Sequence, residues 1–179
     1  MSVPQVLLIN GSVGAGKTSV ADAIYNILSD AGGRCALIDM DFLRAFSPRP
    51  KDDPFGTQLG CVNLKSIANN YISHGIDNFI IPSVIESKEE IKKYRISVDP
   101  RAQVLTVRLE ADIEVTKKRL AEREGPDSIE WCINRSEELT KSLRVGAIDD
   151  TAIQTDNISV QQIAAKILDF WNYNNESQH

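Results

Sequence analysis

The sequence predicts an α/β fold in which a five-stranded, mainly parallel sheet lies between two layers of helices. Two observations lead to this fold class. Short apolar runs alternate with segments of helical period along the 179 residues, and strands joined through helices run parallel and need cover on both faces. In addition, a glycine-rich stretch over residues 9–20, INGSVGAGKTSV, joins the first apolar run to the first helical segment.

The first strand and the first helix have the clearest patterns. Residues 5–10 read QVLLIN, a short apolar run that is typical of a buried strand. From Lys17 onward the period changes, because apolar side chains recur three or four positions apart. The sequence AGG at residues 31–33 is a stop signal for this helix.

The next four segments carry a second strand, a loop, a helix and a third strand. Residues 34–43, RCALIDMDFL, are expected to form a strand that runs into acidic residues. Residues 45–60 contain three prolines and two glycines, a composition that indicates a loop. Residues 62–75 have a helical pattern that ends at a glycine, and the apolar residues within 77–87 indicate the third strand.

A further strand lies among three helical segments. Residues 87–95, SKEEIKKYR, begin like a capped helix, and the apolar run within 102–111 predicts the fourth strand. Residues 112–124 form an expected helix with Asp112 as its N-cap. Residues 125–143 are expected to form a turn followed by another helix.

The last two elements complete the alternation. Residues 151–156 are expected to form the fifth strand, and the amphipathic residues 159–171 the final helix. The chain has no internal repeat and no low-complexity segment. We therefore expect one domain over residues 1–179.

Composition and charge exclude several classes of protein. The net charge of −5 argues against general binding of nucleic acid, which requires a basic surface. No apolar run approaches the roughly 18 residues that span a membrane, and the N-terminus lacks the basic residues of a signal peptide. Three cysteines without metal-type spacing favour a reducing compartment. A soluble cytoplasmic protein is expected, and the sequence does not indicate an oligomeric state.

The glycine-rich stretch fits a phosphate-binding loop, or P-loop. Gly11, Gly16, Lys17 and Thr18 match the pattern G-x-x-x-x-G-K-[ST], in which backbone N–H groups hold phosphate oxygens, the lysine binds the β- and γ-phosphates and the hydroxyl binds Mg²⁺. The alternative is a plain turn between strand and helix, but the strand before it and the helix after it favour the P-loop. The residues expected to bind the nucleotide are Gly11, Ser12, Val13, Gly14, Ala15, Gly16, Lys17, Thr18 and Ser19.

Two carboxylates follow the second expected strand. Asp39 and Asp41 are two positions apart, and in an extended segment such residues face the same way. Ligands of open α/β sheets bind at the carboxyl ends of the strands. One carboxylate is therefore expected to accept the proton of an attacking hydroxyl and the other to support Mg²⁺. The alternative is an acidic turn that caps the next element.

Three arginines are candidates for neutralising a transferred phosphoryl group. Arg119 and Arg123 are four positions apart on an expected helix and share a face, and Arg135 follows in the next helix. The alternative is a solvated face in which these side chains pair with Glu122 and Glu124.

The arginines lie in a region that has the features of a lid. The sequence EGPDS at residues 124–128 is typical of a hinge between two helices, and we place the lid at about residues 119–144. Closure of such a lid excludes water, which matters when the phosphoryl acceptor is not water.

The chain resembles the small P-loop kinases, a group that includes adenylate, gluconate and adenylylsulfate kinases and chloramphenicol phosphotransferase. GSVGAGKT is similar to their Walker A loop, KKRLAERE to the start of their lid, and LIDMDFLR to the L-D-G-D-N-V-R segment of adenylylsulfate kinases. The resemblance implies a P-loop kinase fold with a helical lid. It also implies that Asp41 lies against the acceptor, that Arg44 contacts an acceptor anion and that the lid arginines contact phosphates.

These features together predict an ATP-dependent phosphotransferase that requires Mg²⁺ and moves the γ-phosphoryl group to a hydroxyl of a small molecule. The expected catalytic residues are Lys17, Asp41, Arg119, Arg123 and Arg135; those near the acceptor are Asp39, Asp41 and Arg44; those near the metal are Thr18 and Asp39. The sequence PSVIESKEE after the third strand and the 45–60 segment differ from adenylylsulfate kinases, so the acceptor is not identified. The alternatives are a nucleotide-binding switch or regulatory NTPase module, a nucleotide kinase, and a kinase-like toxin acting on a cell-wall sugar nucleotide.

Overall fold

The computed structural model describes residues 2–125 and 127–176, and in these residues five strands and seven helices follow one another along the chain. The elements are β1 (Gln5–Gly11), α1 (Lys17–Asp30), β2 (Cys35–Leu37), α2 (Met40–Leu43), α3 (Thr57–Ser73), β3 (Asn78–Pro82), α4 (Lys88–Val98), β4 (Gln103–Glu110), α5 (Ile113–Arg123), α6 (Ile129–Gly146), β5 (Thr151–Gln154) and α7 (Val160–Glu176).

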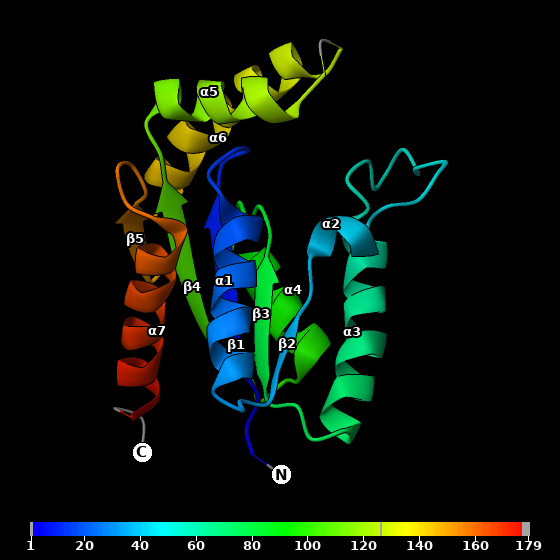
Figure 1. The fold of residues 1–179 in the computed structure, drawn as a ribbon. Helices are drawn as coiled ribbons and strands as arrows, with labels where there is room; N and C mark the ends of the chain where they lie inside the picture. The colour runs from blue at the N-terminus through cyan, green and yellow to red at the C-terminus, as the bar shows by residue number, and fades with distance from the viewer. Residues whose placement is uncertain (1, 126, 177–179) are drawn as a thin grey trace.

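The strands form one parallel sheet in the order β2-β3-β1-β4-β5. Helices α1 and α7 cover one face and α3 and α4 the other, while α5 and α6 lie beyond the carboxyl ends of the strands (Figure 1). The predicted fold class, a parallel α/β sheet covered on both faces, is confirmed. None of the helices within the described residues is both long enough and apolar enough to cross a membrane.

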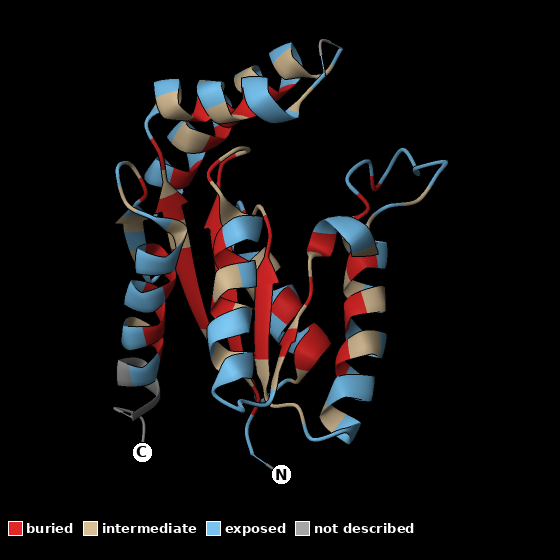
Figure 2. Cartoon of the chain, viewed as in Figure 1, coloured by how far each residue is buried: buried red, intermediate tan, exposed pale blue. Residues whose placement is uncertain are grey.

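The central strand β1 explains the uninterrupted apolar run near the N-terminus. Leu7 and Ile9 pack into the cluster beneath α1 and α7, whereas Val6 and Leu8 pack into the cluster beneath α3 and α4. All four side chains are fully buried, and Figure 2 shows the sheet as a buried layer between the helices. Each contributes about 1.5–3 kcal/mol by burial, and together they hold the P-loop at the end of a rigid strand.

The second strand is shorter than the sequence pattern predicts. The expected strand over residues 34–43 ends at Leu37, and the short helix α2 begins at Met40. Asp39 is the N-cap of this helix, because its Oδ1 atom accepts a hydrogen bond from the backbone N–H of Asp41 at 2.9 Å. The prediction that Asp39 and Asp41 lie in an extended segment is therefore wrong, and a helix cap brings them together instead.

Helix α3 begins before the end of the segment expected to be a loop. The carboxylate of Asp53 accepts hydrogen bonds from the backbone N–H groups of Thr57 (2.7 Å) and Gln58 (2.9 Å). These bonds satisfy two donors of the first helical turn, so the helix starts at Thr57 and the loop ends at Gly56. The third strand, expected over 77–87, ends at Pro82. The other elements lie in the regions that the sequence predicts.

Candidate active site

The P-loop joins the end of β1 to the start of α1 and contains glycine where the backbone requires it. Gly11 has a φ of 144°, and a Cβ atom at this position would lie 2.7 Å from the carbonyl oxygen of Leu109. Gly16 is the N-cap of α1 and has a φ of 95°, which other residues rarely adopt. The backbone N–H groups of such a loop and the N-terminus of the helix suit phosphate oxygens.

Lys17 lies across this loop. Its Nζ atom donates hydrogen bonds to the carbonyl oxygens of Gly11 (3.0 Å) and Ser12 (2.9 Å). Burial lowers the pKa of Lys17 to about 8. The carboxylate of Asp41 acts against this shift by raising the pKa, and the guanidinium of Arg123 lowers the pKa further. The ammonium is therefore still largely protonated at pH 7, and it lies close enough to Asp41 and Arg123 for their charges to act on it.

Thr18 and Asp39 form a pair of oxygens beside the P-loop. The Thr18 hydroxyl donates to Asp39 Oδ2 at 3.3 Å, while Asp39 Oδ1 caps α2. Within the described part of the chain, no three His, Cys, Asp or Glu side chains form a group that could hold a metal by themselves. The pair suits Mg²⁺, which binds through one or two protein oxygens together with substrate phosphates and water.

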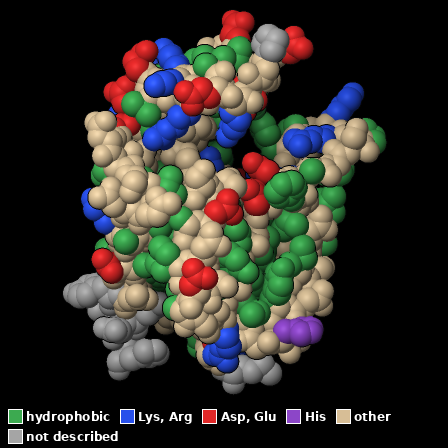
Figure 3. Space-filling model, viewed as in Figure 1, with side chains coloured by type: hydrophobic (Ala, Val, Ile, Leu, Met, Phe, Trp, Pro, Cys, Tyr) green, Lys and Arg blue, Asp and Glu red, His purple; other side chains and the backbone are tan. Residues whose placement is uncertain are grey.

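A pocket of about 320 Å³ opens next to the P-loop, between helices α5 and α6 and the segment that carries α2. It is lined by Val13 of the P-loop and by four residues that the sequence singles out, Asp41, Arg44, Arg123 and Arg135. Figure 3 shows the hollow beneath the lid helices, with Lys and Arg side chains along its upper border and acidic side chains below. Side chains from three distant segments therefore meet beside the phosphate site.

Arg44 forms one wall of this pocket and has neutral partners. Its Nη2 atom donates to the hydroxyl oxygens of Ser83 (2.6 Å) and Tyr94. Burial raises the pKa of Tyr94 while Arg44 lowers it, so the phenol is neutral near pH 7. Among residues 2–125 and 127–176, Arg44 has no ion pair, and its buried Nε atom has no hydrogen-bond partner. The guanidinium charge is thus not neutralised by a carboxylate.

The absence of a side chain at Gly60 makes room for Arg44. A Cβ atom at Gly60, in the first turn of α3, would lie 2.9 Å from Cγ of Arg44. Helix α3 therefore holds the arginine against the sheet, and this explains why the guanidinium is only partly exposed.

The two arginines of α5 take different positions. Arg119 lies over the P-loop, since its Nη1 atom is 4.0 Å from the position of a Cβ atom at Gly16. Arg123 lines the pocket but forms an ion pair with the neighbouring Glu124 at 2.8 Å. The sequence left open that these arginines pair with neighbouring glutamates on a solvated face. Arg123 does form such a pair, with Glu124, whereas Arg119 does not pair with any of the described residues.

Arg135 of α6 lies on the opposite side of the pocket. It forms ion pairs with Glu86, which follows β3, and with Glu138 at 3.0 Å. Its guanidinium also lies over the ring of Phe55, 5.9 Å from the centroid, a geometry typical of a cation–π contact. Arg135 thus connects the lid with the loop before α3.

Helices α5 and α6 are packed directly on the P-loop. The hydroxyl of Ser136, fully buried in α6, donates to the carbonyl oxygen of Val13 at 2.9 Å. A Cβ atom at Gly14 would lie 3.0 Å from Cγ2 of Thr116 and 3.1 Å from Cγ of Leu120. Helices α5 and α6 therefore form a wall beside the P-loop.

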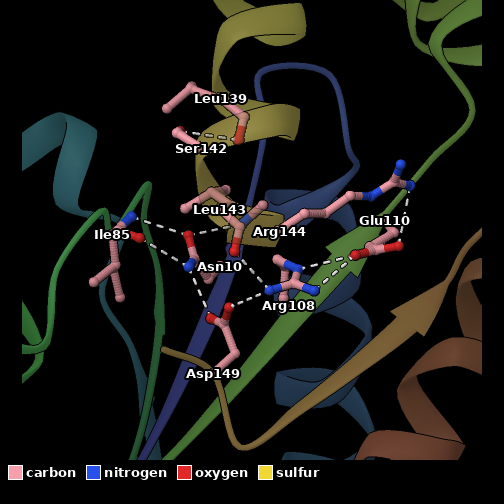
Figure 4. A network of polar contacts seen from close by, with 10 residues as sticks. Asn10, Ile85, Arg108, Glu110, Leu139, Ser142, Leu143, Arg144 and Asp149 are labelled. Carbon is pink, nitrogen blue, oxygen red and sulfur yellow. Dashed lines mark hydrogen bonds and ion pairs between the residues drawn. The ribbon is translucent and has the colours of Figure 1, made fainter. Parts of the chain in front are cut away.

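A buried polar network, which sequence analysis did not identify, fixes the start of the P-loop (Figure 4). Asn10 donates to the carbonyl oxygen of Ile85 (2.9 Å) and to Asp149 (2.8 Å), and it accepts from the N–H groups of Gly11 (2.8 Å) and Ile85 (2.9 Å). Burial raises the pKa of Asp149. The only sequence signal was an asparagine at the end of an apolar run.

Arg108 extends this network to the lid. Its Nη1 atom donates to Asp149 and to the carbonyl oxygen of Leu143, each at 2.9 Å, and its Nη2 atom donates to Glu110 at 2.7 Å. The network therefore joins β1, β4 and the end of α6 (Figure 4). It holds the P-loop and the end of α6 in a fixed relation.

Two exposed aromatic side chains also border the pocket. Phe55, from the loop before α3, is 56% exposed, and Trp131, from the first turn of α6, is 60% exposed. In the sequence alone, a tryptophan at position 131 could cover a base but is more often a packing residue. The exposure of these two aromatic side chains next to charged groups could not be read from the sequence and is seen only in the folded structure.

Comparison with known families agrees with this geometry. The sequence model of the Zeta toxin family matches residues 2–98, more than half of the chain. The chain belongs to the Zeta toxin family. The matched residues of this Zeta toxin family protein include the P-loop, the two aspartates, Arg44 and the segment after β3.

A curated relative of the Zeta toxin family chain is the bifunctional enzyme CysN/CysC of Rhodopirellula baltica. The two sequences are 21% identical over 169 residues, which is 93% of this chain and 26% of the relative. The chain thus spans about a quarter of the length of the curated relative that it matches.

Solved structures share the fold of the Zeta toxin family chain, and one of them is a kinase of the group that its motifs resemble. The tunicamycin resistance protein of Deinococcus radiodurans matches with a TM-score of 0.63 and 20% identity, over 94% of this chain and 95% of that protein. The adenylylsulfate (APS) kinase CysC of Mycobacterium tuberculosis, solved with AMPPNP and APS, matches with a TM-score of 0.59 and 17% identity, over 94% and 98%. At this identity the likeness establishes the fold.

Proposed function

We propose that the chain is an ATP-dependent, Mg²⁺-requiring phosphotransferase whose acceptor is a hydroxyl of a small molecule. One observation carries the proposal: Asp41, Arg44, Arg123 and Arg135, which come from separate segments, line one pocket beside the P-loop. A carboxylate, a lysine and several arginines around a phosphate loop are the groups that phosphoryl transfer requires. The kinase neighbours of this fold support the same reaction class.

The donor side suits ATP with Mg²⁺. Bound ATP would supply the phosphoryl group that is transferred. The P-loop N–H groups and the Lys17 ammonium hold its phosphates, and Arg119 lies over the same loop. The Thr18 hydroxyl oxygen and Asp39 Oδ2 are the oxygens on the metal side, and these two atoms are 3.3 Å apart.

The acceptor side centres on Asp41. Its side chain is exposed and lines the pocket, while the carboxylate of Asp39 is occupied by Thr18 and by the cap of α2. Asp41 therefore orients the acceptor hydroxyl and takes its proton, and Asp39 supports the metal. This division follows from the contacts of Asp39, since only Asp41 has both carboxylate oxygens available to the pocket.

The lid contributes charge and excludes water. We assign residues 1–179 to one domain with its lid at about 119–144, anchored through Ser136. Arg123 and Arg135 neutralise charge on the transferred group. To do so they exchange their present ion pairs, Arg123 with Glu124 and Arg135 with Glu86. This exchange couples repositioning of the two arginines to the arrival of an anion.

The pocket also limits the acceptor. Arg44 presents a cation without a carboxylate partner among the described residues, so the acceptor carries an anionic group. Phe55 and Trp131 expose aromatic surface on two sides of the pocket, which suits a flat or apolar ring in the acceptor. A small molecule with a hydroxyl, an anionic group and a ring satisfies all three features.

The family match favours a second candidate function, a kinase-like toxin that acts on a sugar nucleotide. Such an acceptor has hydroxyls, phosphates and a flat base, and it therefore meets the requirements of Arg44, Phe55 and Trp131. This candidate differs from the first in the identity of the acceptor, not in the chemistry of transfer.

Radiolabel transfer from γ-labelled ATP tests the proposal. The protein is incubated with labelled ATP, Mg²⁺ and a pool of small metabolites in which sugar nucleotides form a separate fraction. Wild type should label a small molecule, and the Lys17→Ala protein should not, while both remain folded. Labelling confined to the sugar-nucleotide fraction would select the second candidate. Absence of labelled product, with ATP hydrolysis that responds only to a protein partner, would instead indicate a nucleotide-binding switch.

A further inference from the structure

A second depression lies between α4 and the start of β4. Its volume is about 690 Å³, and its lining residues come from α4, from residues 101–106 and from the segment before β5. The lining residues of this groove and those of the active-site pocket do not overlap within the described chain. Neither the P-loop nor the proposed transfer reaction makes use of it.

Three cations line one wall of the groove. Lys88, Lys92 and Arg95 are spaced four and three positions apart on α4, so they share one face. Among the residues that the structure describes, none of these three side chains forms an ion pair or a hydrogen bond. Their charges are therefore available to a ligand.

The other charged groups of the groove already have partners. Arg101 forms an ion pair with Asp99 at 2.8 Å. Asp150, the carboxylate that lines the groove, accepts a hydrogen bond from the backbone N–H of Thr106 at 2.7 Å. The groove consequently keeps a net positive charge, in a chain whose net charge is −5.

Two of the three cations, Lys88 and Lys92, are unfavourable for the helix that carries them, whereas Arg95 lies in the last turn, where the helix dipole favours a cation. Lys88 and Lys92 are like charges four positions apart, an arrangement that destabilises an isolated helix. Lys88 is also the first residue of α4, where the helix dipole disfavours a cation. Glu89 and Glu90 offset the dipole in the first turn, but they form no ion pair with the row. A local cost without a compensating contact points to a function for the charges.

We infer that this groove is a second binding site, for a phosphate-bearing small molecule with several negative charges. Lys88 to Arg95 span about 10 Å of helix, so the three cations can converge on one compact polyanion. Ile91, Val104 and Ile148 provide an apolar floor for the rest of the molecule. The volume lies within the range of roughly 300–1,000 Å³ that is usual for small-molecule sites.

Calorimetric titration with inorganic tripolyphosphate tests the site. Wild type should bind it in two places, the P-loop and the groove; saturating AMPPNP should remove only the first, and the substitution Lys17→Ala should weaken only the first. The double variant Lys92→Gln/Arg95→Gln should keep the P-loop site and lose the groove site, with affinity reduced about tenfold or more.

A matched control removes the same charge elsewhere. Lys65 on α3 and Lys166 on α7 are exposed and lie outside the groove, so Lys65→Gln/Lys166→Gln should retain both sites. The midpoint of urea unfolding should change little in both double variants, because among the described residues the substituted side chains have no hydrogen bond or ion pair to lose, and the like-charge repulsion that Lys92→Gln relieves is small. A single tripolyphosphate site in wild type, or equal weakening in the control, would overturn the inference. So would binding of phosphatidylserine vesicles through Lys92 and Arg95 without a second tripolyphosphate site.

Discussion

The substitution Asp39→Asn should separate the structural role of this residue from its role at the metal. Asp39 Oδ1 caps α2, and Oδ2 accepts from Thr18 at 3.3 Å. Asparagine keeps a carbonyl oxygen for the cap, and Asn and Asp are about equally good N-caps, so stability should change by less than about 0.5 kcal/mol. The amide group that replaces Oδ2 cannot bind Mg²⁺, and the apparent affinity for Mg²⁺ should fall by about 10–100-fold.

Two measurements and two reference variants decide this prediction. Urea unfolding gives the stability, and turnover as a function of Mg²⁺ gives the apparent metal affinity. Asp39→Ala should lose the cap as well, at about 0.5–2 kcal/mol. Asp41→Asn should lower turnover at saturating Mg²⁺ by about 10²–10⁴, the usual effect of losing a general base, without shifting the Mg²⁺ dependence. A larger Mg²⁺ shift in Asp41→Asn than in Asp39→Asn would refute the assignment of the two carboxylates.

Three further outcomes are expected. Asn10→Ala should lower the free energy of unfolding by about 3 kcal/mol or more, because buried partners lose their hydrogen bonds, whereas the exposed Asn26→Ala should change it by less than about 0.5 kcal/mol in the same urea titration. The pKa of Lys17 is about 8, so ATP affinity should be constant at pH values below 8, where the ammonium is charged, and should fall by up to about tenfold per pH unit above 8. The substitution Lys17→Ala should abolish this pH dependence. A wild-type ATP affinity that does not change with pH would contradict the prediction. Arg119→Ala and Arg123→Ala should reduce kcat more than ATP affinity, and equal losses in both quantities would indicate simple ground-state binding.

The fold and the P-loop could be predicted because their signals are local. The apolar runs, the change of period at Lys17 and the glycine pattern each occupy a few consecutive residues. The short helix α2 could not be predicted from a local pattern, because LIDMDFL has the composition of a strand. The hydrogen bond by which Asp39 caps the helix favours the helix over the strand. Similarly, the carboxylate of Asp53 starts α3 within a segment whose prolines and glycines indicate a loop.

The environment of the pocket could not be predicted, because it depends on residues that are distant in the sequence. Arg44 meets Ser83 and Tyr94, which are 39 and 50 positions away. A resemblance placed Arg44 near an acceptor anion, but no local pattern indicates that its partners are neutral hydroxyls. The same holds for Glu86, which meets Arg135 across 49 positions.

The buried bonds of Asn10 determine when the nucleotide site can form during synthesis of the chain. Asn10 and Asp149 are 139 positions apart, and at ribosomal rates of about 5–20 residues per second the second is made roughly 7 to 28 s after the first. Strand β1 also waits for β3 and β4, its partners on both sides. A nascent chain that stops before β4 leaves the apolar β1 without one of its two partners. A chain that stops before Asp149 lacks the bond that anchors the P-loop through Asn10, so the P-loop gains its full set of bonds only after Asp149 has been made.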